Sequence, residues 1–187
     1  MKLVILDRDG VINQDAGPEA TDCITAVADW QPLAGSINAI AALHQAGFSV
    51  VIATNQPGLA SGALDLDDLE AIHARLTQAV EEAGGEIAAI FYCPHSDQDA
   101  CNCRKPKTGL IDAIEAEFDL AASEIPFVGD GIDDLLAANA KDCDPILVRT
   151  GQGRASETAM TGISELEGVP VFDDLSAAAA FIIQRYN

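Results

Sequence analysis

Short apolar runs alternate with longer amphipathic segments along most of the chain. The runs are rich in Val, Ile and Leu, and such short, continuous runs are typical of strands buried on both faces of a parallel sheet. We predict strands at Leu3–Leu6, Val50–Ala53, Ile87–Tyr92, Pro126–Val128, Ile146–Val148 and Val169–Phe172. Apolar residues at helical spacing predict helices at Ser36–Gln45, Asp67–Ala83, Leu110–Phe118, Ile132–Ala140 and Leu175–Gln184. This alternation predicts an α/β fold with a doubly wound parallel sheet.

Two of the predicted helices carry a histidine on or beside their apolar stripe. In the first helix, Ser36 is expected to be the N-cap and Gly47 lies just past the end. His44 and His73 fall at positions that face or border the core. We interpret both as packing residues rather than catalytic ones.

Length and composition indicate one globular domain. The chain has 187 residues, of which 49% are hydrophobic, and we expect a single domain over 1–187. Its net charge of -20 makes nucleic acid and anionic membranes poor partners. No secretory leader pattern opens the chain and no apolar run reaches membrane length, so we expect a cytoplasmic protein. We also expect a monomer.

The few cations lie in short segments that follow or interrupt the apolar runs. An acidic protein that keeps its cations in loops is expected to bind an anionic ligand there. The residues concerned are Arg8, Arg104, Lys105, Lys107, Arg149 and Arg154.

Two carboxylates emerge where the first strand ends, in the segment Asp7-Arg8-Asp9-Gly10. Open α/β sheets keep their active sites at the carboxyl ends of the strands. Asp7 and Asp9 begin on the same side of the chain, and two like charges so close need a cation or a basic group between them. The pair suggests metal-assisted phosphoryl chemistry. The alternative is an Asp-rich turn in which Gly10 takes a positive φ.

Polar residues also follow two later strands. Thr54, Asn55 and Gln56 offer a hydroxyl, side-chain amides and backbone N–H groups that can cradle a phosphoryl group, although such residues also form ordinary turns. Asp130 follows Gly129 at another strand end and suits Mg²⁺, which prefers hard oxygen ligands. Asp133 or Asp134 is expected to cap the following helix.

A group of soft ligands precedes the basic segment around Lys105. Cys93, His95, Cys101 and Cys103 stand as two pairs of spacing two, which is the make-up of a closed structural zinc site. Buried free thiols or a disulfide are the alternatives, and Cys23 and Cys143 are expected to be free thiols. A zinc loop over residues 93–103 would present Arg104 and Lys105, which can pair with phosphate.

The order of these segments resembles the four motifs of the haloacid dehalogenase (HAD) superfamily of phosphatases. The segment from Asp7 to Asn13, the Cys-Pro-His and Cys-x-Cys-Arg-Lys-Pro loop and the run Val148-Arg149-Thr150-Gly151 look like the heptose bisphosphate phosphatase branch. Histidinol-phosphate phosphatases are near relatives that share the zinc loop. The resemblance covers residues 2 to about 151. It implies a HAD-type fold with no large cap domain and a small sugar phosphate as substrate.

The resemblance also implies a role for each matching residue. Asp7 would be the nucleophile that forms an aspartyl-phosphate, and Asp9 the general acid and base. Mg²⁺ would be held by Asp7, the backbone carbonyl of Asp9 and Asp130. Thr54 and Lys105 would bind the transferring phosphoryl group. The sugar or its second phosphate would be contacted by Asn55, Gln56, Arg104 and the segment Asp15–Pro18.

Three positions depart from the pattern of this branch. Pro57 stands where a serine is usual, Ser61 where an arginine is usual and Gly131 where lysine or a polar residue often stands. Each change removes a potential contact to a distal anion. The predicted function is hydrolysis of the 7-phosphate of a heptose 1,7-bisphosphate, and the alternative is a histidinol-phosphate or general sugar-phosphate phosphatase. A phosphate-sensing module without catalysis is the non-enzyme alternative, and the presence of both Asp7 and Asp9 favours the enzyme.

Overall fold

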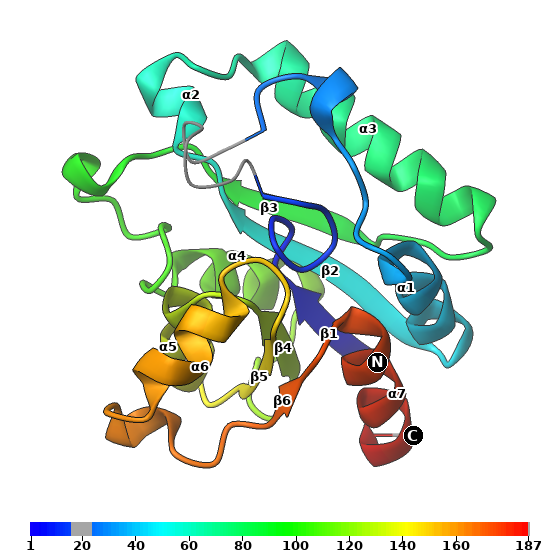
Figure 1. The fold of residues 1–187 in the computed structure, drawn as a ribbon, viewed down its shortest axis with the longest axis vertical. Coiled ribbons are helices and arrows are strands. Elements are labelled where there is room, and N and C mark those ends of the chain that lie inside the picture. The colour runs from blue at the N-terminus through cyan, green and yellow to red at the C-terminus, as the bar shows by residue number, and fades with distance from the viewer. Residues whose placement is uncertain (16–23, 187) are drawn as a thin grey trace.

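Six parallel strands form one sheet in the computed structural model, which describes residues 1–15 and 24–186 (Figure 1). The sheet order is β3-β2-β1-β4-β5-β6, and each neighbouring pair is parallel. The strands are β1 (Lys2–Leu6), β2 (Phe48–Asn55), β3 (Ala89–Cys93), β4 (Pro126–Gly129), β5 (Asp144–Val148) and β6 (Val171–Phe172). The order reverses between β1 and β4, which is where doubly wound sheets open a crevice for ligands.

Helices cover both faces of this sheet (Figure 1). They are α1 (Ser36–Gln45), α2 (Gly58–Ser61), α3 (Leu66–Glu82), α4 (Gly109–Phe118), α5 (Ile132–Asn139), α6 (Gly153–Met160) and α7 (Leu175–Tyr186). Single 3-10 turns lie at Val27–Asp29, Asp97–Asp99 and Ser164–Leu166. The predicted fold class is confirmed, and the described part of the chain carries no large cap over the sheet.

The side chains of β1 show how one strand serves two cores. Val4 and Leu6 belong to the cluster that contains the apolar faces of α1, α3 and α7. Leu3 and Ile5 point to the opposite face and pack with α4 and α5. Because successive strand residues point to opposite faces, a strand covered on both sides must be apolar throughout. This explains why the strand pattern is a continuous run rather than an alternation.

One local expectation about the helices was wrong. Ser36 is the first residue of α1 and not its N-cap, which is Gly35. The Ser36 hydroxyl is buried and donates to the carbonyls of Ile12 and Leu33, at 2.6 and 2.9 Å, so it ties the helix to the loop after β1. The cap position is held instead by Gly35 with a φ of 80°, a conformation that glycine adopts without strain.

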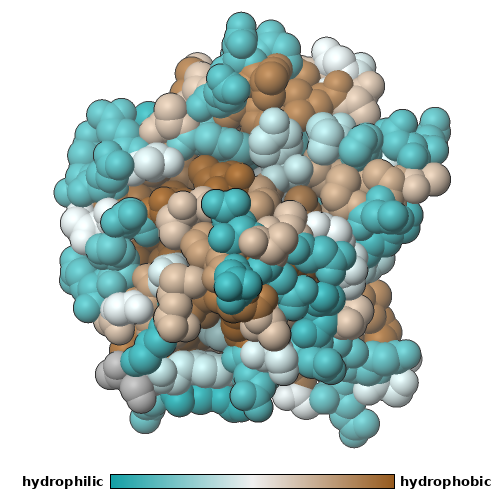
Figure 2. Space-filling view, turned by 180° about the vertical axis from the view of Figure 1, so that it is seen from behind, coloured by the Kyte–Doolittle hydropathy of each residue, from teal (hydrophilic) through white to brown (hydrophobic). Residues whose placement is uncertain are grey.

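The surface in Figure 2 is largely hydrophilic, as expected for a chain with a net charge of -20. Seen from behind, hydrophilic residues surround this face and apolar ones gather towards its middle (Figure 2). No helix of the described residues combines the length and the apolar character that crossing a bilayer requires.

Helix α6 was absent from the sequence prediction because it has no apolar stripe. Its buried residues are Gly153 and Ser156, and its position is set by contact with the end of β5. An ideal Cβ on Gly153 would lie 1.7 Å from the carbonyl oxygen of Val148, so only glycine allows this approach. The close contact brings the start of α6 to the carboxyl end of the sheet.

We expect Gly153→Ala to lower the free energy of unfolding by about 2–3 kcal/mol, because the new methyl group must displace backbone. Urea unfolding followed by circular dichroism measures this. Gly162→Ala is the matched control, since nothing lies within 4 Å of a Cβ there, and it should change stability by less than about 0.5 kcal/mol. A Gly153→Ala variant as stable as the wild type would contradict the contact.

Candidate active site and metal centre

A polar cavity of about 450 Å³ opens at the carboxyl ends of β1, β2 and β4. Parallel strands bring their ends to one edge of the sheet, so residues far apart in sequence meet there. The cavity is lined by Asp7, Asp9, Asp15, Thr54, Asn55, Pro57, Arg104, Lys105, Asp130, Gly131, Ile132, Asp133, Asp134, Gln152 and Ser156. Two cations therefore face six carboxylates across this space.

The ammonium group of Lys105 lies at the floor of the cavity and is almost fully buried. Its Nζ is 2.9 Å from Asp7 Oδ1 and 2.5 Å from Asp134 Oδ1, and it donates to the carbonyl of Ala53 at 2.8 Å. These two carboxylates raise the pKa of Lys105 although burial opposes them. The lysine therefore stays charged and holds the Asp7 carboxylate in place.

Three carboxylates crowd together beside this lysine. Oxygen atoms of Asp7, Asp130 and Asp134 lie within 4.8 Å of one another, close enough to hold one metal ion. Burial, and then the charge of Asp134, raises the pKa of Asp7 to about 7, and burial raises that of Asp130. When all three carboxylates are ionised, the single ammonium leaves two negative charges uncompensated. A divalent cation with a preference for oxygen ligands would balance them.

Gly10 is required at the turn beside these carboxylates. Its φ is +79°, and a Cβ there would lie 2.0 Å from Asp130 Oδ2. The turn with a positive φ at Gly10 and the carboxylate group were alternatives in the sequence, and the structure has both. The bare turn lets Asp130 approach β1 closely.

The carboxylate of Asp9 is turned away from the three-carboxylate group and receives several donors. Arg8 donates to it through Nε and Nη2, over 2.9–3.3 Å. Asn13 and Gln56 each donate through a side-chain amide at 2.8 Å. Trp30 in turn donates to Asn13 Oδ1 at 3.1 Å. Asp9 is thereby held in one orientation at the edge of the cavity.

The residues after β2 divide into two kinds. Thr54 and Asn55 line the cavity, and Asn55 exchanges hydrogen bonds with the backbone of Lys105, each at 3.1 Å. Gln56 is fully buried and does not line the cavity, which differs from its expected substrate contact. Its Nε2 donates to both Asp9 and Thr54, so it orients two residues that face the substrate space.

The residues expected to contact the far part of the substrate lie in different places. Asp15 and Arg104 line the cavity. The Arg104 guanidinium also pairs with Asp97 of the loop between β3 and α4. Pro18, like Cys23, lies outside the described residues.

Of the six cations expected to meet an anionic ligand, two line the cavity, and the expectation was wrong for Arg8 and Arg149. Arg8 is fully buried and neutralises Asp9 from behind. Arg149 pairs with Glu157 and Asp173, each at 2.7 Å. The position of a cation in a loop therefore did not predict whether it lines the cavity or pairs with carboxylates elsewhere.

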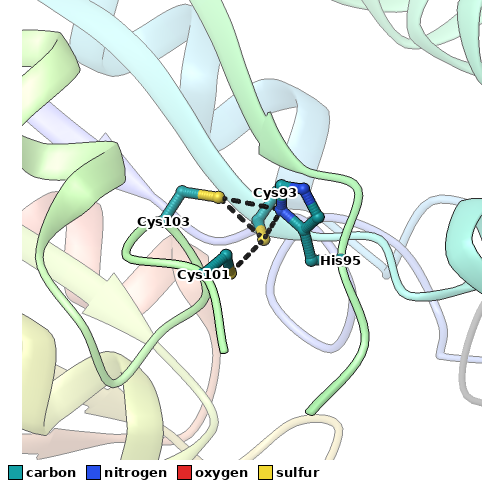
Figure 3. Close-up of side chains that lie close together, drawn as sticks. All are labelled: Cys93, His95, Cys101 and Cys103. Atoms are coloured by element: carbon teal, nitrogen blue, oxygen red, sulfur yellow. Dashed lines mark hydrogen bonds between the residues drawn. The ribbon is translucent and has the colours of Figure 1, made fainter. Parts of the chain in front are cut away.

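Four side chains converge at the end of β3, in front of the basic segment (Figure 3). Cys93, His95, Cys101 and Cys103 place one ligand atom each within 4.8 Å of the others. The sulfurs of Cys93 and Cys103 are 3.1 Å apart, and His95 Nδ1 is 3.3 Å from the sulfur of Cys103. All three cysteines are free, which contradicts the disulfide alternative. Three sulfurs and one imidazole nitrogen suit zinc.

Asp134 is the residue whose role the sequence analysis missed. It was expected at most to cap α5, and its Oδ2 does accept from the backbone N–H of Gly131 at 3.0 Å. Its Oδ1 also pairs with Lys105 and belongs to the three-carboxylate group. The available signal was the spacing from Asp130 to Asp134, which places both on one side of the strand-to-helix turn.

Known proteins of similar sequence and structure decide the family. The chain is 50% identical over 182 residues to the D-glycero-β-D-manno-heptose-1,7-bisphosphate 7-phosphatase of Pseudomonas aeruginosa, covering 97% of this chain and 98% of that protein. The chain belongs to this phosphatase family. It is also 45% identical over 185 residues to the protein of the same name from Neisseria meningitidis serogroup B, covering 99% of this chain and 96% of that one.

Structural comparison places the phosphatase in the HAD superfamily. A crystal structure of the D,D-heptose 1,7-bisphosphate phosphatase from Bordetella bronchiseptica, complexed with magnesium and phosphate, superimposes with a TM-score of 0.90 at 43% identity. The match covers 98% of this chain and 99% of that one. A family model described as HAD-hydrolase-like matches residues 102–178. The resemblance seen in the sequence is therefore confirmed, and the phosphatase is a hydrolase.

We expect about one tightly held zinc ion per chain of the phosphatase, bound by the four-ligand group at the end of β3. Elemental analysis of the purified protein after dialysis measures it. Cys101→Ser removes one thiolate and should lower the zinc content severalfold. Cys143→Ser, at a buried thiol outside the group, is the matched control and should keep the zinc. Wild-type protein without zinc would refute the site.

Proposed function

We propose that the chain removes a phosphate from a sugar phosphate through an aspartyl-phosphate on Asp7, and that its substrate is a D-glycero-D-manno-heptose 1,7-bisphosphate cleaved at C7. One observation carries the proposal. Asp7 and Asp9 stand together at the end of β1 with Lys105 on Asp7, in a chain that aligns nearly end to end with phosphatases named for this substrate.

In the first step, an oxygen of Asp7 attacks phosphorus and the bond from phosphorus to the sugar oxygen breaks. Asp9 gives its proton to the departing oxygen. Lys105 lies 2.9 Å from Asp7 and supplies positive charge where the phosphoryl oxygens gather. Thr54 Oγ1 accepts from Gln56, so its own hydrogen is available for a phosphoryl oxygen.

In the second step, Asp9 takes a proton from water, and that water oxygen attacks the phosphorus of the aspartyl-phosphate. The bond between phosphorus and Asp7 breaks, which releases inorganic phosphate, restores the Asp7 carboxylate and leaves Asp9 protonated for the next cycle. The three-carboxylate group of Asp7, Asp130 and Asp134 fits Mg²⁺, with the backbone carbonyl of Asp9 as a further ligand. When bound, the ion would neutralise phosphoryl charge.

We expect Asp7→Asn to lower kcat by at least about a thousandfold, because the amide cannot form the acyl phosphate. The variant should melt no lower than the wild type, since a neutral side chain relieves repulsion within the three-carboxylate group. Phosphate release and thermal unfolding measure the two effects. Asp67→Asn, an exposed carboxylate of α3, is the control and should stay fully active. Turnover near the wild-type rate in Asp7→Asn would refute the covalent route.

We propose that Arg104 recognises the second phosphate of the substrate. It lines the cavity beside Lys105, and its planar guanidinium can grip an anion with two hydrogen bonds. Ser61 stands where related chains carry an arginine, so Arg104 should provide most of this recognition alone. Its partner Asp97 is exposed, so an incoming phosphate competes with a solvated carboxylate.

For Arg104→Ala, kcat/KM for the heptose bisphosphate should fall about ten- to a hundredfold, as expected for a lost charge-assisted contact of about 1.5–3 kcal/mol. The loss on p-nitrophenyl phosphate should be much smaller. Lys107→Ala removes a cation of the same loop that does not line the cavity, and it should behave like the wild type on both substrates. An equal loss on both substrates in Arg104→Ala would show that Arg104 organises the site generally.

A further inference from the structure

A buried arginine connects Asp9 to a histidine that the catalytic steps do not use. The guanidinium of Arg8 is fully buried and makes a forked contact with the Asp9 carboxylate through Nε and Nη2. Its third nitrogen, Nη1, lies 3.1 Å from Nε2 of His73 on α3. Arg8 thus stands between the cavity and a helix that does not reach it.

The contact with His73 fixes the plane of the Arg8 guanidinium. A guanidinium has five N–H donors in one rigid plane and no way to lose its charge. Within residues 1–15 and 24–186, His73 is the partner recorded for Nη1. Without this acceptor, a buried N–H would lack a partner, at a cost of about 1–3 kcal/mol. Rotation of the guanidinium to find another acceptor would also turn its forked contact with Asp9.

His73 has the protonation state that this contact requires. Burial, and then the charge of Arg8, lowers the pKa of His73 to about 4, so the ring is neutral near pH 7. Since Arg8 can only donate, His73 Nε2 accepts and the ring hydrogen lies on Nδ1. The flanking residues Leu69, Ile72 and Leu76 anchor this part of α3 in the core.

We propose that His73 is a positioning residue that acts through Arg8 to hold the Asp9 carboxylate in the orientation needed for proton transfer. The inference rests on the proposed function, in which Asp9 protonates the departing sugar oxygen. It gives His73 a role beyond the packing expected from the sequence. His73 itself does not line the cavity.

The leaving group distinguishes positioning from simple stabilisation of the fold. A sugar oxygen departs poorly without a proton, whereas p-nitrophenolate departs as an anion. The ratio kcat/KM reports the steps up to departure of the leaving group. A misplaced Asp9 should therefore slow cleavage of the heptose bisphosphate more than cleavage of p-nitrophenyl phosphate. Partial loss of folded protein would slow both equally.

The experiment compares His73→Leu with His73→Gln on both substrates. In His73→Leu, kcat/KM should fall about tenfold or more for the heptose bisphosphate and less than about threefold for p-nitrophenyl phosphate. His73→Gln offers an amide oxygen near the place of Nε2 and should recover most of the loss. His44→Leu removes a half-buried histidine of α1 as the matched control and should leave both values unchanged.

Equal losses on the two substrates, or no recovery in His73→Gln, would overturn the positioning role. If His73→Leu does not fold, as judged by circular dichroism, His73→Gln is compared with a third variant, His73→Asn. The shorter amide of His73→Asn cannot reach Arg8 Nη1, so this variant should show the selective loss on the heptose bisphosphate while His73→Gln stays close to the wild type. Asp9→Asn separates this inference from the proposed function. If Asp9→Asn shows no dependence on the leaving group, Asp9 is not the acid and the proposed function fails. If it shows the dependence and His73→Leu does not, the inference alone fails.

Discussion

The buried ammonium group of Lys105 joins the parts of the chain that make up the site. It meets Asp7 after β1, the carbonyl of Ala53 in β2 and Asp134 at the start of α5. A buried charge is tolerated only where such partners surround it. The positive charge of the lysine also offsets the repulsion among Asp7, Asp134 and the nearby Asp130. The site edge of the sheet is therefore held together by the same charge that we propose for binding the phosphoryl group.

The loop that supplies Lys105 has little apolar surface with which to fold. Its Cys93, His95, Cys101 and Cys103 converge next to the basic segment, so a bound zinc ion would fix the position of Arg104 and Lys105. Asp9, which also follows β1, is fixed by Arg8 and by side-chain amides. The proposed nucleophile, Asp7, is thus held through Lys105 of the Cys/His loop, and the proposed proton donor, Asp9, through Arg8, which contacts His73 of α3.

Few cations are present in this acidic chain, and three of them lie at the site. Of the ten Lys and Arg residues, the two that line the cavity and Arg8 behind it serve the site. Such a cavity attracts phosphate only when its own carboxylates are compensated. A divalent cation held by the three-carboxylate group would balance this charge, and it would then act in substrate recognition as well as in chemistry.

Local apolar runs and short spacings along the chain predicted the fold class, the strand ends at which the cavity opens and the grouping of Cys93, His95, Cys101 and Cys103. Helix α6 was not predictable, since a glycine approaching the end of β5 positions it and no apolar stripe does. Only the tertiary structure showed that Asp134 pairs with Lys105 and that Arg8 rests on His73. Such contacts join residues from separate strands and helices, whose separation in space is set by how the layers pack.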